Sequence, residues 1–131
     1  MTILDNPPGV PAPPPGRYSH IAVVDLSGKK LLALSGQVAM DSDGKLVGED
    51  DISAQTRFVM DTIGTILAAH GATFAHVINV RTYLTDMSLV GDYAEARRNR
   101  FPGPMPTSTT VEVSRLFLPG ALLEVEVTAV I

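Results

Sequence analysis

The sequence predicts an α+β fold in which two helices pack on one face of a β-sheet. Stretches that favour helices lie at 52–70 and 88–100. Stretches that favour strands lie at 20–26, 31–40, 77–84, 107–113 and 122–130. This order, β-β-α-β-α-β-β, provides the strands of one sheet, and 131 residues suit one domain with a core of its own.

The N-terminal residues 1–15 stand apart because they are rich in proline. Proline has no backbone N–H, so such a stretch suits neither a helix nor the interior of a sheet. We therefore expect an extended arm over 1–15, for which a neighbouring subunit is one resting place. A single domain is expected over 16–131.

The first helix gives the clearest pattern. Residues at helical spacing are Ile52, Thr56, Val59, Ile63, Ile66, Leu67 and His70. Asp50, Asp51 and Ser53 are candidate N-caps, and Gly71 stands where a glycine commonly ends a helix. The second helix is expected to stop before Pro102.

The strands are bounded by turns and carry alternating side chains. SGKK at 27–30 and DSDG at 41–44 are typical turn sequences. Residues 77–84 alternate, as does the closing stretch LEVEVTAV, where apolar residues take every second position. The sheet face away from the helices then needs cover, and a second copy of the chain is the obvious one.

Composition favours a soluble cytoplasmic protein without nucleic-acid binding. The net charge is −4, whereas a nucleic-acid binder usually carries a basic stripe. The only basic cluster, Arg97, Arg98 and Arg100, is interpreted as a solvated helix end. Cysteine is absent, no 18-residue apolar run exists, and the N-terminus lacks the features of a secretory signal.

Several short motifs are not supported. GKK at 28–30 lacks the rest of a phosphate-binding loop, and the glycine of DSDG comes too early for a calcium loop. His20, His70 and His76 are scattered, so we expect no metal site. No GxSxG sequence is present to indicate a hydrolase triad.

A larger constellation resembles the RidA (YjgF) family from about residue 16 to the end. It comprises GRYSH (16–20), LSGQVAMDSDGKLVG (34–48), AQT (54–56), HGATFAHVINVRTYLTDM (70–87), VEVSRL (111–116) and LEVEVTAV (123–130). The resemblance implies a chorismate-mutase-like mixed sheet with two helices on one face. It also implies a homotrimer with three clefts between subunits and no cofactor. Family members include hydrolases of enamines and imines, chiefly 2-aminoacrylate, and others described as endoribonucleases or translation inhibitors.

The resemblance also implies site residues. Tyr18 and Ser35 match substrate-binding positions, and Glu124 matches the glutamate expected to act on water. The family's deaminases have the pattern P-x-R-S-x-V-E-V, in which the arginine binds substrate. Ser108 stands in place of that arginine, and Thr110 takes a position that is often cysteine. The hydroxyl-rich stretch TSTT at 107–110 is therefore expected to line the cleft without a guanidinium.

The missing arginine has a chemical consequence. Arginine binds a carboxylate through two charge-assisted hydrogen bonds, which serine cannot reproduce. Losing such a partner costs about 2–5 kcal/mol, so efficient action on 2-aminoacrylate is not expected unless another cation enters the cleft. Arg17 is the preferred substitute, ahead of Arg115 and Arg81.

Three functions follow as hypotheses. The first is hydrolysis of a small imine or enamine, and the second is a catalytically silent trimer that binds a small ligand in the same cleft. Ribonuclease activity is a remote third, because the chain is acidic and lacks a histidine pair suited to phosphodiester cleavage. Each residue also has an ordinary alternative: Glu124 as a surface carboxylate, Tyr18 as packing, Ser35 as a turn hydroxyl, and Ser108 and Thr110 as strand formers.

Overall fold

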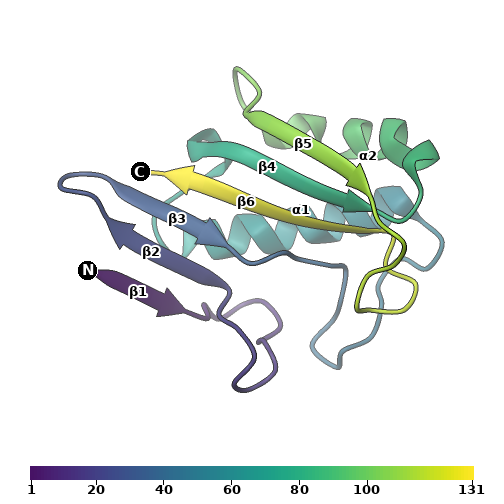
Figure 1. The fold of residues 1–131 in the computed structure, drawn as a ribbon, viewed down its shortest axis with the longest axis horizontal. Helices are drawn as coiled ribbons and strands as arrows, with labels where there is room; N and C mark the ends of the chain where they lie inside the picture. The colour runs from purple at the N-terminus through teal and green to yellow at the C-terminus, as the bar shows by residue number, and fades with distance from the viewer.

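The structure, a computed structural model, describes residues 1–131 and contains one six-stranded sheet in the order β1-β2-β3-β6-β4-β5 (Figure 1). The strands are β1 (Thr2–Asp5), β2 (Ile21–Asp25), β3 (Lys30–Leu34), β4 (Val77–Leu84), β5 (Thr107–Glu112) and β6 (Leu123–Val130). The β4 and β5 strands are parallel, and every other neighbouring pair is antiparallel. The predicted α+β class is thus confirmed.

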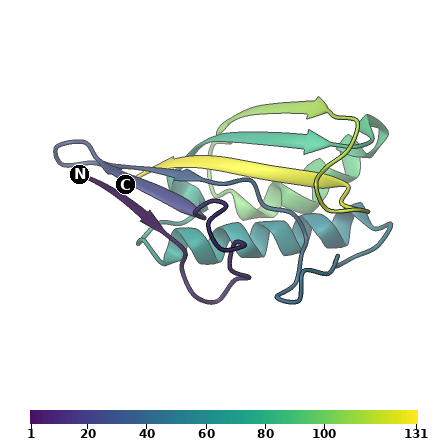
Figure 2. The same ribbon diagram turned by 60° about the horizontal axis from the view of Figure 1, so that its bottom comes forward.

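Helices α1 (Ile52–Ala68) and α2 (Val90–Arg97) both cover the same face of the sheet (Figure 2). The Asp51 side chain caps α1 by accepting from the Ala54 N–H at 2.9 Å, as its sequence position suggested. After α1 the chain turns at Gly71, whose φ of 76° lies in the region that favours glycine. None of the helices combines the length and apolar character needed to cross a membrane.

The core lies between this helical layer and the sheet. On β6 every second residue is buried, namely Leu123, Val125, Val127 and Ala129. They pack in one cluster with α1 residues such as Ile63 and Ile66. The apolar alternation of β6 therefore serves the helical face, and it gives no support to the idea of an apolar outer face.

The opposite, open face of the sheet is polar at its centre. Glu124 and Glu126 of β6 lie there, beside Arg81 and Tyr83 of β4 with which they pair in register. A β-bulge at the start of β4 changes the alternation, because Val77 pairs with Ala129 and Asn79 with Thr128. Ile78 is consequently 49% exposed, although the simple alternation placed it with the buried Val80.

The first part of the expected extended arm lies on the chain's own sheet. Thr2–Asp5 forms β1, which pairs with β2 at the edge of the same chain's sheet. These residues precede the first proline, Pro7, so their N–H groups are free to join an edge strand. Asp5 also accepts a hydrogen bond from His70, after α1, at 2.8 Å.

Two further elements are shorter than the sequence pattern suggests. The strand expected over 31–40 ends at Leu34, after which the chain makes only an isolated bridge from Gln37 to Val125. The helix expected over 88–100 is three pieces, since 3-10 turns at Met87–Leu89 and Arg98–Arg100 flank α2. The second predicted helix is therefore correct in place but not in regularity.

Candidate functional site

Glu124 lies on the open sheet face, packed against Gly36, which follows β3. A Cβ atom placed on Gly36 would lie 2.8 Å from Glu124 Cδ, so the Glu124 carboxyl can occupy this position only while residue 36 has no side chain. Burial raises the pKa of the Glu124 carboxyl, and the nearby negative charge of Glu126 raises it further. A carboxyl with a raised pKa can exchange protons with a substrate near neutral pH.

Tyr18 and Ser35, the other residues predicted on this side, approach the same region. The Ser35 hydroxyl donates to the Ser19 carbonyl at 2.5 Å, so Ser35 ties the segment that carries Tyr18 to the end of β3. Tyr18 is 42% exposed, and burial together with the charge of Glu124 raises the pKa of its phenol. Tyr18 and Glu124 therefore share one surface, whereas Ser35 serves mainly to hold it.

Gln37 and His20 lie beneath this surface and are linked to Ser35 by hydrogen bonds. The Gln37 amide contacts His20 Nδ1 at 3.2 Å and donates to the Ser35 carbonyl at 3.1 Å. Both side chains are buried. With Tyr18 and Gly36 they border a cavity of about 20 Å³, which has room for about one water molecule. The SGQ sequence thus supplies the support of the site, with the glycine as its contact to Glu124.

Glu126 is the second carboxylate of this face, and its environment is opposite to that of Glu124. It accepts hydrogen bonds from Arg81 Nε at 3.0 Å and from the Tyr83 hydroxyl at 2.6 Å. Burial alone would raise the pKa of Glu126, but these two donors outweigh it and hold the pKa below its usual value. Two neighbouring carboxyls therefore differ in proton affinity, which suits Glu124 rather than Glu126 for proton transfer.

Ser108 and Thr110 lie on the other face of the sheet. In the parallel pairing Ser108 is opposite Val80 and Thr110 opposite Thr82, both of which face the helices. Glu124 instead pairs with Tyr83 on the open face. One chain therefore does not bring these hydroxyls to Glu124, and a cleft that contains both must use two copies.

A residue that the sequence interpretation assigned to a solvated helix end occupies the place beside Ser108. Arg97, the last residue of α2, donates from its NH2 group to Ser108 Oγ at 3.2 Å. Its guanidinium carbon lies 5.1 Å from the ring centroid of Tyr93. Tyr93 and Arg97 are four residues apart on one helix, so their spacing in the sequence could have indicated the Arg97–Tyr93 contact but not the contact with Ser108.

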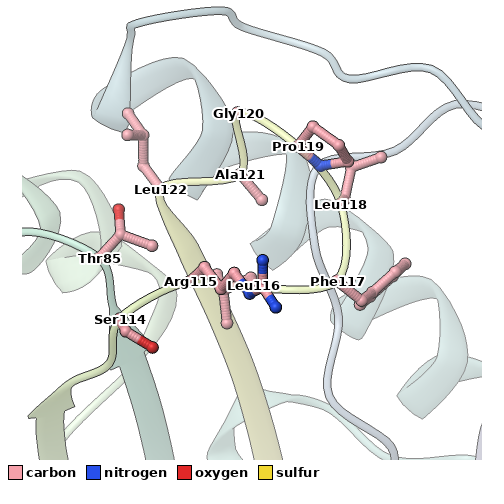
Figure 3. Close-up of a pocket in the computed structure, with 10 residues that line it drawn as sticks. All are labelled: Thr85, Ser114, Arg115, Leu116, Phe117, Leu118, Pro119, Gly120, Ala121 and Leu122. Atoms are coloured by element: carbon pink, nitrogen blue, oxygen red, sulfur yellow. The ribbon is translucent and has the colours of Figure 1, made fainter.

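The cations that the sequence suggested as substitutes have different surroundings. Arg17 is exposed and belongs to none of the chain's four ion pairs, and Arg81 is engaged by Glu126. Arg115 borders an open hollow of about 620 Å³ formed by residues 114–122 with Thr85 at its side (Figure 3). That hollow is not lined by Tyr18 or Glu124.

The chemistry available on the open face is therefore that of proton transfer to and from a small ligand. Glu124 provides the carboxyl, and Tyr18 a phenol next to it. No group of three or more His, Asp or Glu side chains is close enough together to ligate a metal ion.

Fold and site together define a small α+β protein of the RidA type, and comparison with known proteins agrees. The family model described as Endoribonuclease L-PSP matches residues 10–131. Protein DfrA of Myxococcus xanthus is 36% identical over 118 residues, which cover 88% of this chain and 86% of that protein. A RutC family protein of Sulfurisphaera tokodaii is 35% identical over 114 residues, 87% of each chain.

Solved structures give the same result. The crystal structure of YyfA from Yersinia pestis, a protein of the conserved Rid family, has a TM-score of 0.87 and 31% identity over 100% of both chains. The chain therefore belongs to the Endoribonuclease L-PSP family, the RidA (YjgF) family that its motifs resemble.

Proposed function

We propose that this protein is a homotrimer that hydrolyses a small imine or enamine in a cleft between adjacent subunits, without a cofactor. The observation that carries the proposal is Glu124, a carboxyl with a raised pKa packed on Gly36 and next to Tyr18. The reaction class is the one that the resemblance to the RidA family implies, and the chain belongs to that family. The trimer is the assembly that the family resemblance implies.

The reaction needs one group that moves protons in two directions. An enamine first gains a proton on carbon, which gives the iminium ion. The Glu124 carboxylate then takes a proton from water as the water oxygen bonds to the iminium carbon, and a neutral carbinolamine forms. The carbinolamine nitrogen takes that proton back, the C–N bond breaks and ammonia leaves, while the hydroxyl proton returns to Glu124 as the carbonyl forms. Tyr18 is placed to donate a hydrogen bond to the developing charge.

Turnover by a Glu124→Gln variant tests this proposal. Wild type and variant are compared on imines generated in place by a dehydratase, with carbonyl release measured over buffer alone. We expect a fall of about 10²- to 10⁴-fold, the range for loss of a general acid–base group. Glu49→Gln, which removes an exposed carboxylate outside the site, is the control. Equal turnover in wild type and Glu124→Gln would defeat the assigned role.

A catalytically silent ligand-binding trimer is the second candidate. It is favoured by Ser108, because β5 itself offers no guanidinium for a substrate carboxylate. A wild type that binds small oxo or imino compounds but hydrolyses none of them would establish it. Ribonuclease activity ranks below both, since the net charge of −4 and the two carboxylates of the open face disfavour a phosphate backbone.

A further inference from the structure

We propose that Arg97 supplies from helix α2 the guanidinium that β5 lacks, so that the cleft accepts a ligand with a carboxylate next to its imine carbon. This inference rests on the proposed function and names its substrate class. The preferred substitute then becomes Arg97 rather than Arg17, and short 2-imino acids become substrates despite Ser108.

Packing fixes the direction of the Arg97 side chain. Its NH1 group donates to the Tyr93 hydroxyl at 3.1 Å, and Tyr93 is only 1% exposed. The guanidinium carbon lies 5.1 Å from the ring centroid of Tyr93 and 5.8 Å from that of Phe101. Aromatic rings on which a guanidinium stacks hold it in place, so little further ordering is needed when a ligand binds.

Ser108 marks the point that this guanidinium reaches. The NH2 group donates to Ser108 Oγ at 3.2 Å, in an exposed part of the surface. An arginine at position 108 would bring a second positive charge to the same place, where like charges repel. A serine at position 108 therefore avoids repulsion with Arg97. The positive charge lies near Ser108, although α2 rather than β5 carries it.

Arg97 is half-buried and has no carboxylate partner. The other half-buried arginines, Arg81 and Arg100, each form an ion pair with a carboxylate, and the arginines without an ion pair other than Arg97 are exposed. Its Nε atom is buried without a hydrogen-bond partner. An arginine that is partly buried and has no carboxylate carries an uncompensated charge, which the carboxylate of a ligand would balance.

In the proposed cleft, each of two adjacent copies would bind a different group of the substrate. Arg97 and Ser108 of one copy bind the carboxylate, and Thr110, two residues along the same face of β5, lies beside them. Glu124 of an adjacent copy meets the imine carbon. A single chain cannot do both, because its Glu124 and its Ser108 lie on opposite faces of the sheet.

Binding of a stable analogue tests the inference without relying on turnover. Calorimetry compares 2-oxobutanoate, in which a carbonyl replaces the imine, with its neutral amide. Because an adjacent copy would cover Arg97 in the proposed cleft, we expect wild type to prefer the acid by at least about 30-fold, the lower end of the effect of a buried charge pair. Arg97→Met, which keeps an apolar side chain on the aromatic rings, should lose this preference.

Arg98→Met is the matched control, since it removes the same charge from the neighbouring exposed position and should keep the preference. Ser108→Asp is a second test that leaves Arg97 in place, and its carboxylate should pair with Arg97 and abolish acid binding. Equal binding of acid and amide by wild type, or acid preference retained in both Arg97→Met and Ser108→Asp, would overturn the inference.

The two proposals fail in different measurements. If Glu124→Gln leaves turnover unchanged, the catalytic role fails while acid binding through Arg97 stands. If wild type hydrolyses neutral imines but binds no acid through Arg97, the reaction class stands and the carboxylate site does not.

Discussion

Glu124 and Gly36 are in contact although 88 positions separate them in the chain, and a side chain at residue 36 would displace the Glu124 carboxyl. A Cβ there would lie 2.8 Å from Glu124 Cδ and 2.9 Å from Oε2. Because these atoms are the end of a flexible side chain, we expect Gly36→Ala to move the carboxyl and lower turnover, at a stability cost no greater than the lower end of the about 1–3 kcal/mol typical of overpacking.

Gly64→Ala is the matched comparison for Gly36→Ala. Its new Cβ would meet only Phe74 at 3.2 Å, and alanine favours the α1 helix in which Gly64 stands. Chemical unfolding measures the stability of both variants, and turnover is followed on the same samples. Gly36→Ala with wild-type stability and wild-type turnover would show that the carboxyl moves aside freely.

The ionisation of Glu124 predicts a pH-dependent effect on stability. Because burial raises its pKa, the folded protein binds this proton more tightly than the unfolded chain does. The stabilisation from that proton is fully present below pH 4.5, the ordinary pKa of a glutamate, and is lost as the pH rises through the folded pKa. Glutamine cannot ionise, so Glu124→Gln should melt at a higher temperature than wild type at neutral pH.

Thermal unfolding of wild type and Glu124→Gln from pH 4 to pH 7.5 tests the predicted direction of this difference in melting temperature. The advantage of Glu124→Gln should shrink as the pH falls toward 4, because wild type then carries the proton as well. Glu49→Gln should show no comparable trend. A Glu124→Gln variant that is less stable than wild type at pH 7 would mean that the ionised carboxylate has a stabilising partner in the assembled protein.

The sequence was sufficient for the α+β class and for most of the element order. Strand 77–84 and the helix predicted over 52–70, observed at Ile52–Ala68, follow from periodicity, because a side-chain pattern of period 2 or 3.6 is a local property of the chain. The β-bulge at Ile78 is not local, since it depends on how β4 pairs with β6. The early end of the second strand likewise depends on the bridge between Gln37 and Val125.

The candidate site shows the same division between residues that the sequence predicts and contacts that depend on tertiary packing. Tyr18, Ser35 and Glu124 were identified from the sequence, but the role of Gly36 appears only when β6 is placed beside it. Arg17 was the substitute expected for the family's arginine, because it adjoins Tyr18 in sequence. The contact of Arg97 with Ser108 was not predicted, since it depends on the packing of α2 beside β5.

The positions of the β5 hydroxyls and Glu124, together with the family resemblance, predict that the protein assembles into a trimer. Because the hydroxyls of β5 and Glu124 lie on opposite sheet faces, the proposed cleft requires more than one copy. We expect light scattering at micromolar concentration to give three times the chain mass of 13.9 kDa. A mass of one chain under those conditions would remove the basis of the intersubunit cleft.

Subunit mixing tests whether the two halves of the cleft come from different copies. Arg97→Met and Glu124→Gln homotrimers should each be nearly inactive on 2-iminopropanoate. When the two variants are dissociated and reassembled together in equal amounts, about a quarter of the clefts should unite an intact Arg97 with an intact Glu124 of the neighbouring copy. Turnover should therefore recover to about a quarter of the wild-type value. Each variant taken alone through the same procedure is the control. Mixed trimers that form but stay inactive would place both residues' contributions within one copy, contrary to the sheet geometry.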